Sequence, residues 1–220
     1  LTTTMALPQD DDSYRITGTK IFITGGEHDL SENIIHLVLA KTPGAPKGIK
    51  GISLFLVPKI IPYPDGSLDK NNGVECGSIE DKMGIKASPT CVMRYNDAKG
   101  WLVGELHKGM SAMFIMMNGA RLMVGVQGLG MTEIAYQSAL FYAKDRLQGR
   151  YPGGAKHPEK PADPILVHPD VRKNLLKIKS LGEGVRGLIA LTAAQVDVAR
   201  LEKDKLKKQK AEDWVALMTP

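Results

Sequence analysis

The sequence predicts an α+β protein in which an antiparallel β-barrel or sandwich domain is followed by an incomplete antiparallel helical bundle. Up to about residue 107, apolar residues alternate with polar ones or gather in short β-branched runs, as they do in strands. After Lys108 they recur every three or four residues, as they do on one face of a helix. Because the period changes once, we expect two domains, residues 1–107 and 108–220.

The first domain is expected to consist of short strands joined by turns. The predicted strands are Tyr14–Thr24, Ile34–Ala40, Ile52–Val57, Thr90–Tyr95 and Trp101–Val103. Turn-forming residues separate them, namely Gly25-Gly26, Pro43-Gly44, Pro64-Asp65-Gly66 and Asn71-Asn72-Gly73. No helix-period segment lies between these strands, so we expect antiparallel pairing without crossover helices.

The second domain is expected to contain two long helices. One runs from Gly109 to about Arg146, and the other begins near His168-Pro169-Asp170, where Pro and an acidic residue suit a first turn. The intervening Tyr151–Pro164 is rich in Pro, Gly and Lys and is expected to be an exposed loop. Two amphipathic helices need further helices to cover them, so the bundle is expected to be unfinished at Pro220.

Composition narrows the class of protein. No run of about 18 uninterrupted apolar residues is present, so no membrane span is expected. The two cysteines lack CxxC spacing and the five histidines are scattered, which favours a reduced cytoplasmic protein and makes a metal site improbable. The chain starts without Met or a signal segment, and we expect it to be part of a longer protein.

The net charge of +5 includes a late lysine run, Lys203–Lys210. Such a run could attract phosphate-bearing partners, but a solvated helix face or a connection between helices is the commoner explanation. Nucleic-acid binding is not expected, because neither interleaved aromatics nor a known reading module accompanies the lysines.

The segment Ile16–Gly26 is the first candidate for a binding site. A strand that ends in the hydroxyl of Thr24 and two glycines could bring backbone amides against a flat polar ligand, while Phe22 offers an apolar face. From the residues alone, an ordinary hairpin strand with a tight turn remains the alternative.

This segment resembles the G-x-K-x-[WF]-I-T-[NG] stretch of the acyl-CoA dehydrogenase family. Four further segments resemble family motifs in the same order along the chain: Asp81–Ser88, Trp101–Met110, Asn118-Gly119-Ala120-Arg121 and Tyr142–Arg146. The stretches Ile23–Asp29 and Met116–Arg121 are most similar to the branch that includes 3-methylmercaptopropionyl-CoA dehydrogenases.

The resemblance implies a role for five residues. Thr24 would hydrogen-bond near flavin N5 and Phe22 would pack beside the isoalloxazine. Asn118 would contact the pantetheine or nucleotide arm of CoA, and Arg121 would be a buried support near the acyl site. Arg146 would reach FAD phosphates across a dimer contact. The alternatives are hydrogen-bonded helix-surface groups for Asn118 and Arg121, and a cation that complements the helix terminus for Arg146.

Two positions depart from the family pattern. Leu147-Gln148-Gly149-Arg150 replaces the usual K-[TS]-F-G, and His168-Pro169 stands where many relatives have a glutamine that touches the adenylate. The first departure concerns the contacts to a neighbouring subunit's flavin, and the second concerns the contact to the adenylate.

The family's catalytic glutamate is expected beyond Pro220, and its T-E-P-x-x-G-[ST]-D strand before Leu1. We therefore nominate no catalytic residue, and the 220-residue chain is expected to be inactive and to bind FAD weakly. The remaining glutamates of the helical half, Glu133, Glu183, Glu202 and Glu212, do not stand in the motif of the family base.

The implied parent oxidises an acyl-CoA thioester to the trans-2-enoyl-CoA with FAD as hydride acceptor. It passes electrons to an electron-transfer flavoprotein and forms a homodimer or homotetramer. One alternative is an acyl-CoA oxidase on the same scaffold. The other is a non-catalytic relative associated with nucleic acid, for which the Lys203–Lys210 run would be the feature to test.

Overall fold

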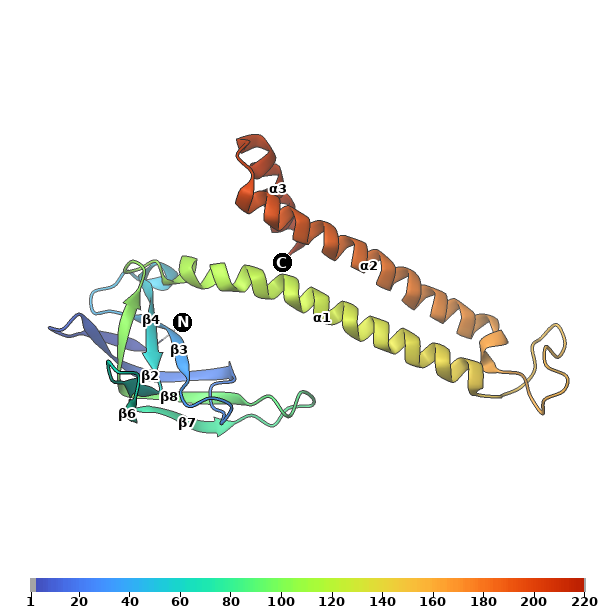
Figure 1. Cartoon of the computed structure of the whole chain (residues 1–220), viewed down its shortest axis with the longest axis horizontal. Coiled ribbons are helices and arrows are strands. Elements are labelled where there is room, and N and C mark those ends of the chain that lie inside the picture. The colour runs from blue at the N-terminus through green and yellow to red at the C-terminus, as the bar shows by residue number, and fades with distance from the viewer. Residues whose placement is uncertain (1–2, 220) are drawn as a thin grey trace. The chain divides into compact units, whose positions relative to one another are not determined.

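The computed structural model describes residues 3–219, which divide into two compact units, Leu1–Met116 and Met117–Pro220. The first unit holds eight strands, labelled in part in Figure 1. Their bounds are β1 Met5–Pro8, β2 Ser13–Thr24, β3 Ile35–Lys41, β4 Ile52–Pro58, β5 Ile60–Pro62, β6 Leu68–Asn71, β7 Val74–Ile79 and β8 Thr90–Val103. A short 3-10 helix, Gly48–Gly51, precedes β4.

Six of these strands form one sheet in the order β2-β1-β3-β4-β8-β7, and β2 also pairs with β8. The five strands β2, β1, β3, β4 and β8 therefore close into a barrel, and β7 extends the sheet along the first half of β8 and contributes Val74 to the core. Every pairing in the barrel is antiparallel except the single parallel contact between Met5 of β1 and Lys41 of β3. The strands β5 and β6 make a separate hairpin.

One long strand, β8, organises this unit. Along one edge it pairs with β2 from Thr24↔Thr90 to Ser13↔Trp101. Along its other edge the first half pairs with β7 and the last residues pair with β4. The prediction of two separate strands, Thr90–Tyr95 and Trp101–Val103, is therefore wrong. The intervening residues stay in the sheet because β2 supplies partners through the irregularity at Asp97, whose φ is 55°.

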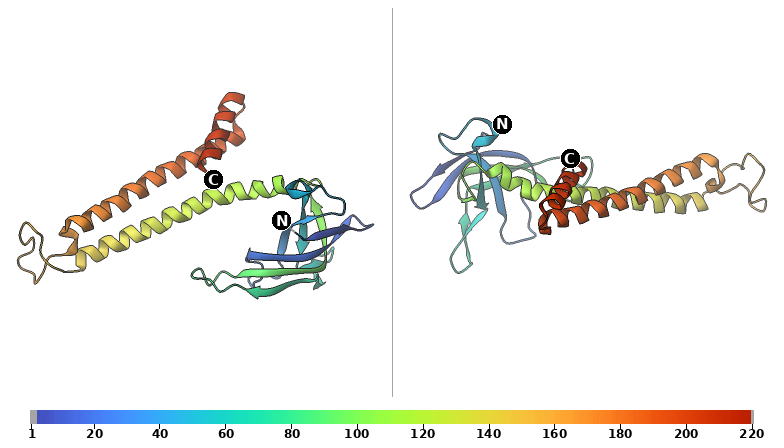
Figure 2. Two further views of the ribbon diagram at one scale, coloured as in Figure 1. Left: turned by 180° about the vertical axis from the view of Figure 1, so that it is seen from behind. Right: turned by 90° about the horizontal axis from the view of Figure 1, so that it is seen from above.

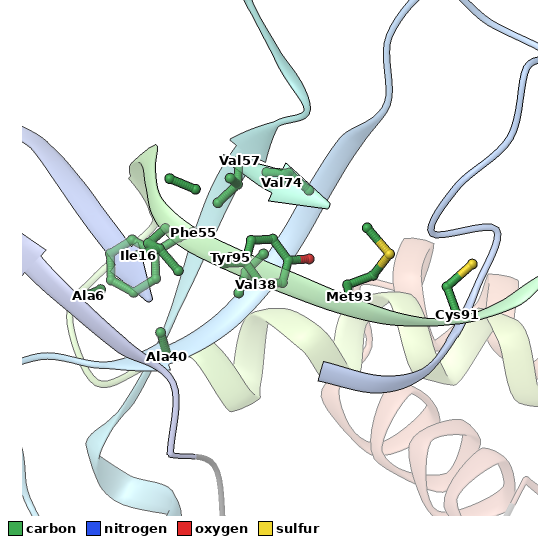
Figure 3. Close-up of a cluster of buried hydrophobic side chains, with 11 residues drawn as sticks. Ala6, Ile16, Val38, Ala40, Phe55, Val57, Val74, Cys91, Met93 and Tyr95 are labelled. Atoms are coloured by element: carbon green, nitrogen blue, oxygen red, sulfur yellow. The ribbon is translucent and has the colours of Figure 1, made fainter. Parts of the chain in front are cut away.

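The barrel core consists of side chains that alternate inward along these strands. Phe55, Ile16, Met93 and Val57 are fully buried, and Figure 3 shows them gathered between the strands. The rings of Phe55 and Tyr14 pack with centroids 4.8 Å apart at an angle of 57°. Such tilted aromatic pairs are favourable beyond the area that they bury.

The helices are α1 Gly109–Asp145, α2 Pro169–Leu201 and α3 Lys205–Met218. The start of α1 packs on the barrel: a Cβ atom on Gly109 would lie 2.4 Å from the Ser53 carbonyl carbon, so only glycine fits there. Helix α2 begins with Pro169 at its first turn, as predicted. Helix α3 begins after Asp204, whose carboxylate accepts hydrogen bonds from the backbone of Leu206 and Lys207.

Within the second unit, α2 lies beside the later part of α1, as the views of Figure 1 and Figure 2 agree. Arg186 of α2 donates to Glu133 of α1 at 3.0 Å, and a Cβ atom on Gly182 would lie 3.3 Å from Thr132. Large apolar side chains on both helices remain exposed, including Met131, Ile134, Phe141, Leu176, Leu181 and Leu191. Two helices alone cannot bury all of these faces.

The predicted α+β class is confirmed, as are the long helices and the Tyr151–Pro164 loop. The sequence did not indicate β1, β7 or the β5–β6 hairpin, because these strands are short, and β6 and β7 carry several charged or polar residues. The two compact units divide inside α1, so the predicted domain boundary at residues 107 and 108 stays a prediction.

Candidate functional site

The last residues of β2 present an apolar ring and a hydroxyl to the outside of the barrel. The pairing of β2 with β8 slips between Lys20 and Ile23, which marks a β-bulge. Phe22 lies in this bulge with φ of 59°, a left-handed conformation that is rare for a bulky residue. Its side chain is 66% exposed. The backbone is therefore strained in a way that aims an aromatic side chain away from the core, and such strain gathers at functional sites.

Thr24 ends the same strand and is exposed, opposite Thr90 of β8. The turn that follows is tightly fixed. Gly25 has φ of 65° and donates to the Pro89 carbonyl at 2.9 Å, while a Cβ atom on Gly26 would lie 2.8 Å from the Met93 sulfur. The conformation of Gly25 favours glycine, and a side chain at residue 26 would force the buried Met93 side chain to shift. The Thr24 hydroxyl thus stands at the end of a rigid strand.

A pocket of about 320 Å³ opens beside this strand end, between β2 and β3. Its lining includes Thr24, Lys20, His36 and Tyr95 together with backbone of both strands. His36 is buried and its Nδ1 lies 3.0 Å from the Tyr95 hydroxyl, while its Nε2 has no hydrogen-bond partner within residues 3–219. Lys20 donates to the Leu39 carbonyl at 2.6 Å.

Burial governs the charge of this pocket. It lowers the pKa of His36, an effect that the Glu27 carboxylate opposes and the Lys59 ammonium reinforces. Burial also lowers the pKa of Lys20 and raises the pKa of Tyr95. The His36 imidazole is therefore held in its neutral form, with the hydroxyl of Tyr95 as its hydrogen-bond partner.

The other three predicted site residues belong to the second unit. Asn118 and Arg121 lie one turn apart on α1, and both side chains are exposed in this chain. Arg146 follows the last residue of α1 and is also exposed; its backbone N–H donates to the Tyr142 carbonyl at 2.8 Å. The structure thus places Phe22 and Thr24 together at the end of β2, and Asn118 and Arg121 one turn apart on α1. The burial that we expected for Arg121 stays a prediction.

The residues after Arg146 form a loop around the carboxylate of Asp163. The sequence predicted the loop but did not indicate the role of this carboxylate. Asp163 is fully buried and accepts backbone hydrogen bonds from Tyr151, Lys156 and His157 at 2.7 to 3.1 Å. Arg150 lies 3.5 Å from the same carboxylate and donates to the carbonyls of His157 and Lys160. The predicted loop is therefore organised by one buried carboxylate, and it follows Leu147–Arg150, the segment that departs from the K-[TS]-F-G pattern.

Within residues 3–219, no three side chains of His, Cys, Asp or Glu gather as they would to hold a metal ion. Cys91 is buried and Cys76 partly so, and both are free thiols. The glutamates of the helical unit have structural partners or are exposed: Glu133 pairs with Arg186, and Glu202 accepts from the backbone of Lys203 and Asp204.

Comparisons with known proteins agree with the resemblance noted in the sequence. Residues 1–98 match the family model described as "Acyl-CoA dehydrogenase, middle domain". The chain is 54% identical over 194 residues to the 3-methylmercaptopropionyl-CoA dehydrogenase of Ruegeria pomeroyi, an alignment that covers 88% of this chain and 32% of that protein.

Two solved structures share the fold. ACDH-11 of Caenorhabditis elegans in complex with C11-CoA superposes with a TM-score of 0.79 at 23% identity, covering 100% of this chain and 33% of that one. An acyl-CoA dehydrogenase of Bacillus anthracis complexed with FAD gives a TM-score of 0.68 at 24% identity, covering 99% and 32%.

The chain spans about a third of the length of the curated relatives that it matches. Both the family predicted from the five motifs and its similarity to the 3-methylmercaptopropionyl-CoA dehydrogenase branch are confirmed. The chain belongs to the acyl-CoA dehydrogenase family.

Proposed function

We propose that the chain is part of an FAD-dependent acyl-CoA dehydrogenase that oxidises an acyl-CoA thioester to the trans-2-enoyl-CoA. It would supply the middle β-domain, residues 1–107, and the first helices of the C-terminal domain, residues 108–220. The bulged end of β2 is the observation that carries this proposal, because it exposes an aromatic ring and a hydroxyl side by side on one rigid strand.

These residues fit a flavin. An isoalloxazine is flat, with apolar faces and polar edge atoms, so it matches an exposed ring such as Phe22 next to a hydroxyl such as Thr24. When bound, FAD would supply the hydride acceptor of the reaction. We infer that Thr24 donates a hydrogen bond near flavin N5 and that Phe22 packs beside the ring system.

The helical unit would bind the substrate and the outer part of the cofactor. Asn118 would hydrogen-bond the CoA arm and Arg121 would support the acyl site. The Arg146 guanidinium would pair with FAD phosphates across a dimer contact, a task that its planar donor fork suits. Since α-proton removal needs a carboxylate, and we nominate none in this chain, the base would lie in the rest of the protein.

The wider setting follows from the same reading. We infer an acyl-CoA substrate, an electron-transfer flavoprotein as electron acceptor, a homodimer or homotetramer, and a cytoplasmic location. The helix α1 is long and apolar enough to cross a membrane by those two criteria alone. Its exposed polar side chains, which include Asn118, Arg121 and Gln127, would be costly in lipid and argue against a membrane span. Its exposed apolar side chains, such as Met131 and Phe141, support instead a helix that other helices of a bundle cover.

A Thr24→Val variant of the whole protein tests the proposal. A panel of acyl-CoA substrates with a dye acceptor first identifies the best substrate, and stopped-flow absorbance then measures flavin reduction. Loss of one hydrogen bond to the developing charge should slow reduction by about 10- to 100-fold. Thr19→Val is the matched control, because Thr19 is an exposed threonine on the same strand. Equal rates for the two variants would contradict the role of Thr24.

A second test concerns the 220-residue chain by itself. We expect it to be inactive and to bind FAD weakly, since the base and further flavin contacts would be supplied from outside it. A stoichiometric yellow complex after addition of FAD and gel filtration would refute this expectation.

A further inference from the structure

The two cysteines of the chain lie on neighbouring strands, Cys76 on β7 and Cys91 on β8. Cys76 pairs with Met93, and Cys91 comes two residues before Met93 on the same strand. Alternate residues of a strand share a face, and Figure 3 shows Cys91 and Met93 on the same side of β8. Cys91 belongs to the buried core and Cys76 packs against that core. The two thiols are therefore diagonal neighbours on one face of the sheet.

The Cys76 side chain is turned along β7 toward Cys91. The pairing of β7 with β8 slips between Cys76 and Ser78, which marks a β-bulge, and Ser78 lies opposite Val92. The Cys76 sulfur points in this direction, because its thiol donates to the Ser78 carbonyl at 3.4 Å. Val92 is the neighbour of Cys91 in the chain, so the bulge directs the Cys76 sulfur to the part of β8 that carries the second thiol.

The two thiols differ in access to solvent. Cys91 is fully buried, whereas Cys76 is partly exposed, so an oxidant dissolved in water reaches Cys76 first. Burial, the hydrogen bond to the Cys91 thiol, and the charges of Cys91 and Glu27 raise the pKa of Cys76. The reactive thiolate is therefore a minor form at neutral pH, and the pair stays reduced until a strong oxidant is present.

We propose that Cys76 and Cys91 form a reversible disulfide when hydrogen peroxide reaches the protein, and that this bond links β7 to β8. The Cys76 thiolate attacks one peroxide oxygen, the O–O bond breaks, and one water leaves as the sulfur becomes a sulfenic acid. The Cys91 sulfur then attacks the Cys76 sulfur, and the S–O bond breaks. The departing hydroxide takes up the proton of the Cys91 thiol and leaves as the second water.

The reaction balances with peroxide as the only co-reactant. Two thiols lose two electrons and two hydrogen atoms, and one peroxide becomes two waters. A small dithiol such as dithiothreitol reverses the step by thiol–disulfide exchange. Disulfides of this transient kind also occur in reducing compartments, where they respond to oxidants.

The position of the bond gives it a structural effect. Cys91 lies opposite Ile23 of β2, and a Cβ atom on Gly26 would lie 3.2 Å from the Cys91 Cβ atom. The disulfide therefore forms next to the strand end that carries Thr24. It closes a loop of about 15 residues between β7 and β8, and a cross-link of this span stabilises the fold mainly by restricting the unfolded chain.

Peptide mapping of the whole protein tests for the bond directly. Trypsin places the two cysteines in separate peptides, 71–82 and 87–94. After peroxide treatment, blocking of free thiols and digestion without reductant, we expect the two peptides joined with the loss of two hydrogen atoms. Dithiothreitol should separate them. If these peptides stay unlinked, or link only between two copies of the chain on a non-reducing gel, the proposal is wrong.

Two single variants test the order of the steps. In Cys91→Ala, oxidation should stop at the Cys76 sulfenic acid, which dimedone traps. In Cys76→Ser, the buried Cys91 should remain a thiol at a peroxide dose that fully oxidises the wild type. Oxidation of Cys91 in Cys76→Ser at the wild-type rate contradicts the first attack at Cys76.

The pH dependence checks the same step. Only the thiolate attacks peroxide, and the pKa of Cys76 is raised from an ordinary value of about 8.5. Disulfide formation should therefore become about tenfold faster for each pH unit between pH 6 and pH 8. A rate that does not change over this range excludes the Cys76 thiolate as the attacking group.

Thermal melting shows whether the native structure already places the two thiols for the bond. The oxidised wild type should melt about 5 °C or more above the reduced wild type. Cys76→Ser receives the same peroxide treatment and should show no such rise, which separates the disulfide from oxidation of other side chains. If oxidation raises the melting temperature of the wild type no more than that of Cys76→Ser, the cross-link distorts the pairing of β7 with β8 and the proposal fails.

Discussion

Replacing Asp163 with asparagine tests whether one carboxylate holds the loop between α1 and α2. The Asp163 oxygens accept three backbone N–H groups, those of His157 at 2.7 Å, Tyr151 at 3.0 Å and Lys156 at 3.0 and 3.1 Å. An asparagine keeps one oxygen and turns an NH2 group toward a backbone donor. At least one hydrogen bond is then lost, and the others no longer have a charged acceptor.

The size of the effect follows from these contacts. A hydrogen bond to a charged acceptor changes an opening equilibrium by about tenfold or more. In Asp163→Asn, one hydrogen bond is lost and the remaining ones are weaker, so the loop amides should exchange about 100-fold faster. Asp163→Ala, which removes all three bonds, should exceed this. The exchange of Tyr151, Lys156 and His157 amides is measured by NMR or mass spectrometry.

The controls separate the buried carboxylate from loop charge in general. Glu159→Gln removes an exposed carboxylate from the same loop and should change exchange by less than about threefold. If the loop amides exchange equally fast in Asp163→Asn and Glu159→Gln, the Asp163 carboxylate does not hold the loop, and other contacts must order it.

The pH dependence adds an independent check. Burial alone would raise the pKa of Asp163, but the N–H groups of Tyr151, His157 and Lys156 and the charge of Arg150 outweigh it and hold this pKa well below its usual range. A depressed carboxyl pKa stabilises the fold above the unfolded pKa of about 3.9. Loop protection should therefore be constant from neutral pH down to about pH 5 and fall only in stronger acid.

Two further predictions concern the barrel. Phe55→Ala should lower the free energy of unfolding by about 3–5 kcal/mol, because the Phe55 ring is fully buried against Tyr14. The control is Phe141→Ala, which removes an exposed ring and should change the free energy of unfolding by less than about 1 kcal/mol; urea denaturation measures both variants. Burial lowers the pKa of His36; the Glu27 carboxylate opposes this shift and the Lys59 ammonium reinforces it. The neutral imidazole therefore stabilises the barrel above pH about 6.5, and this stabilisation is lost as pH falls. The melting temperature should fall from pH 8 to pH 5.5 by more in the wild type than in His36→Phe, and equal falls would contradict a neutral buried imidazole.

The sequence by itself determined the class of fold, the family and the position of the β-to-α change. These depend on local patterns: alternation in Tyr14–Thr24, a three-to-four residue repeat in α2, and turn residues whose backbone needs are intrinsic. The sequence also placed Phe22 and Thr24 on one strand, because residues that are two apart in a strand motif stay on the same strand in any tertiary fold.

Only the tertiary structure decided how the strands meet and which polar groups lack partners. The continuity of β8 through Asp97 depends on β2, more than 70 residues earlier in the chain. The left-handed Phe22 depends on a register slip between two strands, which single-strand periodicity cannot reveal. The pocket between β2 and β3 is lined by residues of separate strands, and the loop around Asp163 forms because backbone amides 6 to 12 residues earlier converge on one carboxylate. Such features depend on how the chain turns back on itself, whereas sequence patterns report the local preferences of each segment.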